Sequence, residues 1–423
     1  MIANASITSY STLLANPADS LSDYIDGSNV TPTIISTAYN IPSNTASNVK
    51  VGIISLGGGW QPSDLQKSLA NLGVTLTQSI TSVLVDGAGN VFSTSDSNAS
   101  LENTLDLYCV AGMAPGANIV LYTGQNSVTG FANVVNRAIN ENCDVISISW
   151  GTDEYYNTDG TFLETAFANA AAQGITICVA TGDYGSSSTI TPRVLSVGYP
   201  ASSPNVVAVG GTVLTYNTAS YSRVTETVSS SSGGGISTVF PVPSWQTGLT
   251  YQKYFTSNSS YGPTTALTGR GVPDVSAPFE TYVLWYDDTI YGVAGTSAST
   301  PIIAGMFARY MSMNGGRRPV INGIHPILYS NINAYSDLTT GTNADPLPQG
   351  YAANIGWDPV VGMGAPLGTV LYPMITSGGT TIKTAANTWS YVSNVKVKTG
   401  STTWSNVKAI WNKVNSTTWK QTF

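Results

Sequence analysis

The sequence predicts a doubly wound α/β fold, in which helices cover both faces of a mainly parallel sheet. Short, mostly apolar segments recur along the first half of the chain and are separated by stretches long enough for helices. Near-continuous apolar runs of this kind are typical of parallel strands buried on both faces. Polar loops containing glycine follow two of these runs directly. In open α/β sheets the functional site lies at the carboxyl ends of the strands.

The elements can be placed in order along the chain. Residues 1–27 are polar and weakly patterned, and we expect them to form an arm across the surface. The region 186–290 is rich in Ser, Gly and Tyr, which predicts β-hairpins and loops. The expected strands of the sheet are 50–56, 118–122, 145–150 and 175–180, and the expected helices are 62–73, 99–111, 130–141 and 160–173.

Composition excludes several classes of protein. Charged residues make up 9% of the chain and hydrophobic residues 42%, which does not fit a disordered protein. No segment has the length and hydrophobicity of a membrane span, and no nucleic-acid-binding motif is present. The first cation is Lys50, so the charged start of a signal peptide is not visible. The cysteines at 109, 143 and 178 match no zinc or redox spacing, and we expect buried free thiols.

The charge is distributed unevenly. All 23 acidic residues and 10 of the 16 Lys and Arg residues precede residue 373, which gives residues 1–372 a net charge of −13. The remaining 51 residues carry six lysines and no acid. A body with few cations suits an acidic environment, because fewer positive charges accumulate there and repel one another. A simple requirement for solubility explains the same composition.

Ser297 occupies a position suited to a nucleophile. An expected strand at 289–294 ends in a glycine turn, and the apolar segment 301–311 is expected to be a buried helix, so Ser297 falls near the start of this helix. Free backbone N–H groups at a helix start can stabilise an oxyanion. An ordinary Ser/Thr helix cap explains the same stretch equally well.

A serine nucleophile needs an adjacent base, which is usually histidine. The chain contains one histidine, His325, in an apolar turn where we expect a packed structural side chain. If Ser297 is catalytic, its base is therefore a carboxylate or a lysine.

Glu102 and Asp106 are the first acids that meet this need. They lie four residues apart in the expected helix 99–111 and therefore share one face. Two stacked carboxylates with no cation between them repel unless they share a proton, which raises one pKa. A solvated acidic face is the alternative, although the helix is mostly apolar and carries only these two acids.

Asp183 follows the expected strand 175–180, in a loop with glycine on either side. A protonated aspartic acid in such a place can donate a hydrogen bond to an oxyanion. The alternative is a turn aspartate whose side chain caps its own loop.

Together these stretches resemble the sedolisins, the serine-carboxyl peptidase family with a subtilisin-like fold. The opening 31–42 is similar to the start of the family's mature enzymes, and the resemblance covers residues 28–372, which we expect to form the peptidase domain. The matching segments follow the family's order: 102–106, 147–151, 181–183, 209–212, 273–277, 295–299 and 356–359.

The resemblance implies roles for individual residues. Ser297 would be the nucleophile, Glu102 its general base, and Asp106 the partner that orients Glu102 and shares its proton. Asp183 would stabilise the oxyanion together with the backbone N–H of Ser297. The backbone of Ser149, Trp150 and Gly151 would line the cleft and pair with an extended peptide or protein substrate.

The resemblance also implies one structural calcium ion near the C-terminus. Two carboxylates and three backbone carbonyls would suit this hard cation, with water completing its shell. Two ordinary turn aspartates are the alternative. The implied ligands are Asp337, Leu338, Asn354, Gly356 and Asp358.

The sequence departs from the family pattern in three respects. Ser55 stands where some relatives carry a Glu that supports the catalytic carboxyls. Relatives are usually made with a large N-terminal prodomain, whereas this chain starts close to the mature enzyme. Residues 373–423 extend beyond the family core and repeat Thr-Trp at a spacing of 15 residues, with Trp389, Trp404 and Trp419.

The extension 373–423 weakly resembles Trp/Lys repeats at the ends of phage structural proteins. We expect a basic module that attaches the chain to a surface or virion, and a small β-flap packed on the body is the alternative. The whole sequence predicts a monomeric, acid-active endopeptidase that is extracellular or virion-associated. A catalytically silent attachment protein with the same fold is the second hypothesis.

Overall fold

The computed structural model describes the body of the chain in detail. The described residues are 20–96, 98–154, 162–188, 194–316, 324–344 and 347–376, together with the backbone of β1 (Ser9–Leu13) and of six short strands between 381 and 421.

The centre of the molecule is an eight-stranded sheet, which confirms the predicted doubly wound architecture. Its strands follow the order β10-β9-β7-β5-β2-β4-β3, and β17 also pairs with β9. All pairings within it are parallel except that of β9 with β10. The strands are β2 (Lys50–Ser55), β3 (Thr81–Leu84), β4 (Asn118–Thr123), β5 (Val145–Ile148), β7 (Thr176–Ala180), β9 (Val207–Tyr216), β10 (Arg223–Val228) and β17 (Val275–Pro278).

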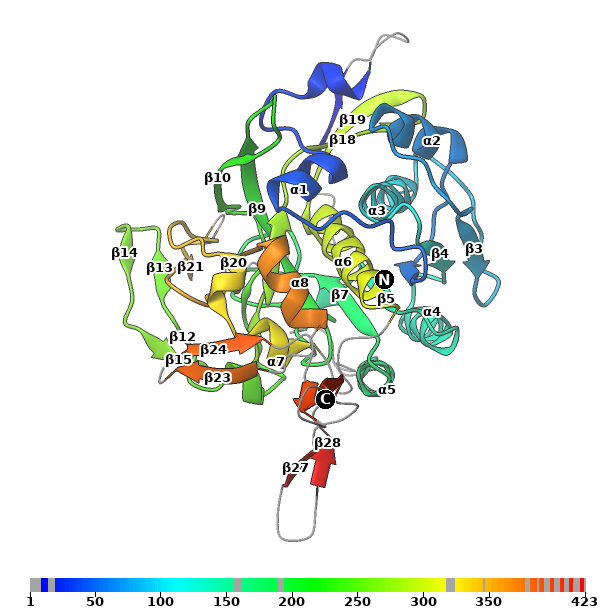
Figure 1. Cartoon of the computed structure of the whole chain (residues 1–423). Coiled ribbons are helices and arrows are strands. Elements are labelled where there is room, and N and C mark those ends of the chain that lie inside the picture. The colour runs from blue at the N-terminus through cyan, green and yellow to red at the C-terminus, as the bar shows by residue number, and fades with distance from the viewer. Residues whose placement is uncertain are drawn as a thin grey trace.

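Helices cover both faces of this sheet because successive strand residues point to opposite sides. Ile53 belongs to the buried cluster that contains helices α3 (Ala99–Met113) and α6 (Thr296–Met313), with α1 (Pro32–Ala38) and α2 (Pro62–Asn71) packed outside them. Its neighbour Ile54 belongs to the cluster under α4 (Val128–Asn140) and α5 (Glu164–Ala172). Figure 1 shows the two helical layers around the sheet.

Helices α3 and α6 approach each other closely, and this contact positions the site. A methyl group at Gly305 would lie 2.7 Å from Cβ of Met113, so glycine permits the approach. Arg309 of α6 then donates from Nε to the Met113 carbonyl and from Nη1 to Ser36 Oγ at 2.7 Å. This cation caps the last turn of α3, where the helix dipole favours positive charge.

The smaller elements surround this core. At the N-terminus, β1 pairs antiparallel with β19 and extends the β18–β19 hairpin. The predicted domain boundary at residue 372 falls inside α8 (Gly368–Thr376), which packs on α6. The expected turn at His325 is a short helix, α7 (His325–Leu328).

The body also contains many short elements, and the region 186–290 includes hairpins, as predicted. The short strands are β6 (Thr152–Asp153), β8 (Gly198–Tyr199), β11 (Gly235–Ile236), β12 (Thr250–Tyr251), β13 (Lys253–Phe255), β14 (Ser260–Tyr261), β15 (Thr265–Ala266), β16 (Gly271–Val272), β18 (Tyr282–Tyr286), β19 (Thr289–Ala294), β20 (Tyr335–Ser336), β21 (Gln349–Tyr351) and β22 (Ala365–Pro366). The 3-10 turns are Leu21–Tyr24, Ser244–Gln246 and Ile332–Ala334.

Three separate hairpins follow the body. Each places a lysine opposite a tryptophan, in the pairs Lys383 with Trp389, Lys398 with Trp404 and Lys413 with Trp419. They consist of β23 (Thr381–Ala385) with β24 (Thr388–Tyr391), β25 (Lys396–Lys398) with β26 (Trp404–Asn406), and β27 (Trp411–Lys413) with β28 (Trp419–Gln421).

Candidate active site

The site is built on α3, whose fifteen residues are all buried. The helix lies between the sheet and the outer helices, and its apolar side chains, among them Leu101 and Leu105, pack into the larger core cluster. Glu102 and Asp106 are carried into the interior by the same helix, and both are fully buried. The alternative of a solvated acidic face is therefore wrong.

Burial controls the charge of this carboxyl pair. It raises the pKa of Glu102 well above its ordinary value, and the neighbouring charges of Asp106 and Asp183 raise it further. The hydroxyls of Ser297 and Ser149 act in the opposite direction. Burial also raises the pKa of Asp106, against a hydrogen bond from Ser149. Two carboxyls in this environment hold fewer than two charges.

Ser297 lies in the first turn of α6, directly after β19. Its hydroxyl is close enough to Glu102 to lower the pKa of that carboxyl, although neither Glu102 oxygen has a hydrogen bond of ordinary geometry. Ser149, which follows β5, joins the two helices, because its Oγ donates to Asp106 Oδ1 at 2.8 Å and lies 3.3 Å from the Ser297 carbonyl oxygen, the longer alternative acceptor. The sheet edge, α3 and α6 therefore meet at Ser297.

Asp183 is held beside the same turn of α6. Its Oδ1 accepts hydrogen bonds from the backbone N–H and the hydroxyl of Thr296, both at 2.8 Å. Thr296 Oγ1 in turn accepts from the N–H of Gly182 at 3.1 Å. Gly182 has φ +101°, a conformation that favours glycine and turns the chain after β7 toward α6. Asp183 is thus fixed by another segment instead of capping only its own loop.

Sequence reasoning missed two contributions. Thr296 was present in the motif but was not assigned a role, and its position directly before Ser297 was the only available signal. Ser149 was assigned to the cleft wall, yet its side chain points inward to Asp106. The Trp150 side chain is also buried, and its Nε1 has no hydrogen-bond partner within the described residues. Because the side chains of Ser149 and Trp150 are both buried, a substrate would bind to the backbone groups of 149–151.

Several buried polar atoms of the site have no hydrogen-bond partner within the described residues: Glu102 Oε1 and Oε2, Asp106 Oδ2 and Trp150 Nε1. Ser55 does not donate a hydrogen bond to these atoms, because its hydroxyl donates to the Gly57 carbonyl at 2.8 Å. Buried polar atoms without partners are costly and concentrate at functional sites.

Comparisons with known proteins agree with this geometry. Residues 88–323 match the model of the subtilase family. The structure aligns with that of Pseudomonas sedolisin, described as a serine-carboxyl proteinase complexed with two molecules of pseudo-iodotyrostatin, with a TM-score of 0.69 and 30% identity over 84% of this chain and 100% of that one.

The chain belongs to the sedolisin family. Kumamolisin of Bacillus sp. (strain MN-32) is 34% identical over 355 residues, which cover 80% of this chain and 62% of that protein. Tripeptidyl-peptidase 1 of Canis lupus familiaris is 31% identical, with coverage of 80% and 62%. The chain thus spans about three fifths of the length of these relatives.

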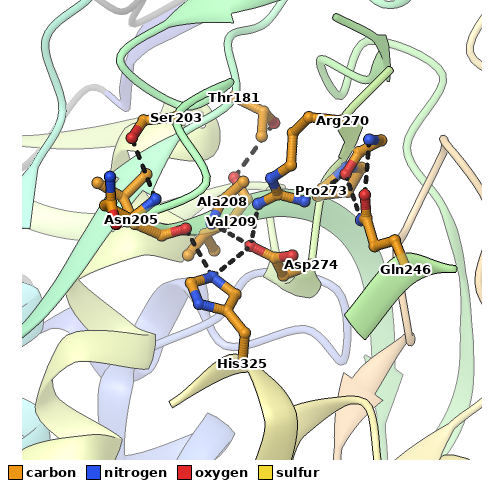
Figure 2. A network of polar contacts seen from close by, with 12 residues as sticks. Thr181, Ser203, Asn205, Ala208, Val209, Gln246, Arg270, Pro273, Asp274 and His325 are labelled. Atoms are coloured by element: carbon orange, nitrogen blue, oxygen red, sulfur yellow. Dashed lines mark hydrogen bonds and ion pairs between the residues drawn. The ribbon is translucent and has the colours of Figure 1, made fainter. Parts of the chain in front are cut away.

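The histidine of this sedolisin lies in a separate network, shown in Figure 2. His325 Nε2 lies 2.8 Å from the Val206 carbonyl and 3.5 Å from Asp274 Oδ2, and its ring stacks on Trp245. Asp274 also accepts from Arg270 at 2.6 Å, and despite burial this cation and His325 hold its pKa far below the ordinary range. The prediction of a packed structural histidine is confirmed.

The residues that the sequence predicts to bind calcium lie around a second acidic loop. The N–H of Gly356 donates to Asp337 Oδ2 at 2.8 Å, and that of Asn354 to Asp358 Oδ2 at 2.9 Å, so both carboxylates face the turn 354–358. Burial raises the pKa of Asp358 to about 7, and the nearby Asp337 adds to this. Within the described residues, Asp337 Oδ1 is buried without a hydrogen-bond partner. A buried carboxylate oxygen of this kind, near a second carboxylate, suits a hard cation.

The described part of the chain lacks two features. None of its helices is long and apolar enough to cross a membrane. Within the same residues, no three His, Cys, Asp or Glu side chains are grouped as metal ligands. Any calcium site in the turn 354–358 would therefore rely on backbone carbonyls in addition to its two carboxylates.

Proposed function

We propose that this sedolisin is an acid-active serine-carboxyl endopeptidase. The observation that carries the proposal is the burial of Glu102 beside the Ser297 hydroxyl, with a second carboxyl on the same helix face and the only histidine engaged elsewhere. A carboxylate can then act as the base, provided that it is ionised and its site is dry.

The chemistry follows from these positions. Ser297 Oγ attacks the scissile carbonyl carbon while its proton passes to Glu102. The tetrahedral intermediate collapses when Glu102 returns that proton to the leaving amine, and an acyl-enzyme on Ser297 remains. Water then attacks the ester and gives a proton to Glu102. Glu102 passes this proton to Ser297 Oγ as the ester bond breaks, so the acid product leaves and both residues are restored. Asp106 orients Glu102 and shares a proton with it.

Asp183 and the N–H of Ser297 would stabilise the oxyanion. Because Oδ1 of Asp183 accepts two hydrogen bonds from Thr296, the proton of a neutral Asp183 sits on Oδ2, from which it can be donated. The reaction therefore requires Glu102 ionised and Asp183 protonated. Activity should fall at low pH as the Glu102–Asp106 pair takes up its second proton. It should also fall at higher pH, where Asp183 loses the proton that it donates to the oxyanion.

The substrate would be an extended peptide or protein segment. The backbone after β5, at Ser149, Trp150 and Gly151, offers hydrogen-bonding groups at the carboxyl edge of the sheet. Gly151 leaves no room for a side chain, since a Cβ there would lie 2.8 Å from the Tyr199 carbonyl.

A calcium ion would stabilise the C-terminal part of the domain. The ligands we propose are the carboxylates of Asp337 and Asp358 and the carbonyls of Leu338, Asn354 and Gly356. Bound calcium neutralises the two acids and fixes the turn 354–358, and it takes no part in peptide cleavage.

The extension 373–423 would attach the enzyme to a surface or virion, in keeping with an extracellular monomer. The support is its composition, six lysines and no acid, and the three hairpins that each pair a lysine with a tryptophan across the strands. A two-stranded hairpin is marginal by itself, so such units need a partner surface or each other.

The proposed function is tested by comparing the chain with its Ser297→Ala variant on a mixed library of internally quenched peptides from pH 2 to 8. We expect an acidic optimum and loss of turnover in the variant with its fold intact. A neutral or alkaline optimum would overturn the assignment. Failure of a peptide aldehyde to form an adduct with Ser297 would identify a catalytically silent protein.

A further inference from the structure

Ser149 has an unusual place in the carboxyl network. Glu102 and Asp106 present four oxygen atoms to a fully buried site, and three of them lack a hydrogen-bond partner within the described residues. The fourth, Asp106 Oδ1, accepts from Ser149 Oγ at 2.8 Å. Ser149 is itself fully buried and also reaches the Ser297 carbonyl at 3.3 Å. Within the described part of the chain, the Ser149 hydroxyl is therefore the only donor with ordinary geometry to the pair.

We propose that Ser149 is a positioning residue that keeps one negative charge on the Glu102–Asp106 pair in acid. The inference rests on the proposed function, in which Glu102 must be ionised to accept the Ser297 proton. It assigns a role to the Ser149 side chain that differs from lining the cleft with its backbone.

The physical reason is that a hydrogen bond to a carboxylate is stronger than one to a neutral acid. In the singly charged pair the two carboxyls share one proton and therefore share the negative charge, and the Ser149 hydroxyl lowers the pKa of both. Without this donor no oxygen of the pair has a hydrogen bond of ordinary geometry within the described residues, only the Ser297 hydroxyl still lowers the pKa of Glu102, and burial favours the doubly protonated pair. Glu102 would then be neutral over more of the acidic range and could not act as a base.

Other charged groups do not supply this stabilisation. Asp183 faces Glu102 from the loop after β7, and its negative charge opposes ionisation of Glu102. Burial and the two carboxyls raise the pKa of the Cys109 thiol on α3 itself, so this thiol stays neutral. The charged and titratable groups on the elements around α3 are engaged elsewhere: Lys50 and Tyr122 with Glu141, Lys67 with Asp288, Asp64 with the N–H of Asp287, Arg309 with the Met113 carbonyl, Tyr310 with the Gly368 carbonyl, Tyr282 with the Pro278 carbonyl and Tyr286 with the Ser93 carbonyl.

The test is the pH dependence of kcat and kcat/KM in Ser149→Ala. The acid limb is the part of the profile in which activity falls as the carboxyl pair takes up its second proton. Loss of one hydrogen bond to a carboxylate should move this limb to higher pH by about one to two units. The alkaline limb should not move. Ser149→Thr keeps the hydroxyl and should restore the original limb, and Ser149→Cys keeps the volume with a weaker donor and should give an intermediate one.

Ser147→Ala is the matched control. Ser147 lies two residues earlier in β5, is equally buried, and its hydroxyl has no partner within the described residues, so its removal should not move the limb. An unchanged limb in Ser149→Ala, or an equal displacement in Ser147→Ala, would overturn the inference while leaving the proposed function intact. A change confined to KM would likewise assign Ser149 to substrate binding alone.

A second readout does not depend on turnover. Carboxyl titration by ¹³C NMR, in chains that carry Ser297→Ala with and without Ser149→Ala, should show the pair taking up its second proton at a higher pH when Ser149 is absent. Identical titrations would refute the role of Ser149 even if the wild-type chain cleaved no peptide.

Discussion

Replacing Glu102 with glutamine measures what its burial costs the folded protein. The carboxyl is fully buried and its pKa is raised well above the ordinary value of 4.5 by burial and by Asp106. Above pH 4.5 the folded state therefore binds a proton that the unfolded state releases. Glu102 should therefore make the wild-type chain lose stability as pH rises through this window, by at most about 1.4 kcal/mol per pH unit, and Glu102→Gln lacks this contribution while Asp106 keeps its own.

The advantage of Glu102→Gln over the wild type should thus grow from pH 4.5 toward neutrality, to at most about 3.5 kcal/mol near pH 7. The assay is urea unfolding at a series of pH values, with Ser297→Ala in both chains to prevent self-digestion. Any constant cost of burying the amide shifts the whole curve and leaves its slope unchanged.

Glu141→Gln provides a control of opposite sign. Although burial opposes it, hydrogen bonds from Tyr122, Arg137 and Lys50 lower the pKa of Glu141 to about 2. The stability that Glu141 contributes is complete above pH 4.5 and is lost only as the pH falls toward 2. The difference between Glu141→Gln and its parent should therefore be constant from pH 4.5 to 7. Parallel stability curves for Glu102→Gln and its parent over the same range would refute the reasoning.

Three further perturbations have defined outcomes. Asp274→Asn removes the charge that pairs with fully buried Arg270 and should lower the free energy of unfolding by about 3–5 kcal/mol in urea titrations, and a loss below 1 kcal/mol would contradict the network. Gly305→Ala places a methyl group 2.7 Å from Met113 Cβ, so α3 should shift from α6 and kcat should fall, with a stability loss of about 1–3 kcal/mol. Chelation of calcium should lower the Tm of the wild type but not of Asp337→Asn, and equal Tm shifts would argue against the proposed ligands.

Much of the fold could be predicted because its strands are buried on both faces and their sequences are almost entirely apolar. The run at 118–122 predicted β4 to within one residue, and that at 145–150 placed β5, which ends at Ile148. The ends of helices and strands were harder to predict where the residues just before and just after the end are equally buried. The segment 373–376 continues α8 beyond the predicted domain end because Met374 and Ile375 are still buried.

The sequence by itself determined which residue types were available: one serine at the start of an apolar helix, two acids one helical turn apart, and a single histidine set in an apolar turn. It could not determine their environment. Whether Glu102 and Asp106 faced water or the interior depended on α6 packing against α3, which Gly305 and Arg309 make close.

Only the tertiary structure decided that Ser149 turns its hydroxyl to Asp106 and that Thr296 holds Asp183. These contacts join segments more than forty residues apart, and no local pattern encodes them. The physical reason is that a carboxyl's proton affinity depends on the water removed from it and on the donors that replace that water, and both are set by the packing of distant elements.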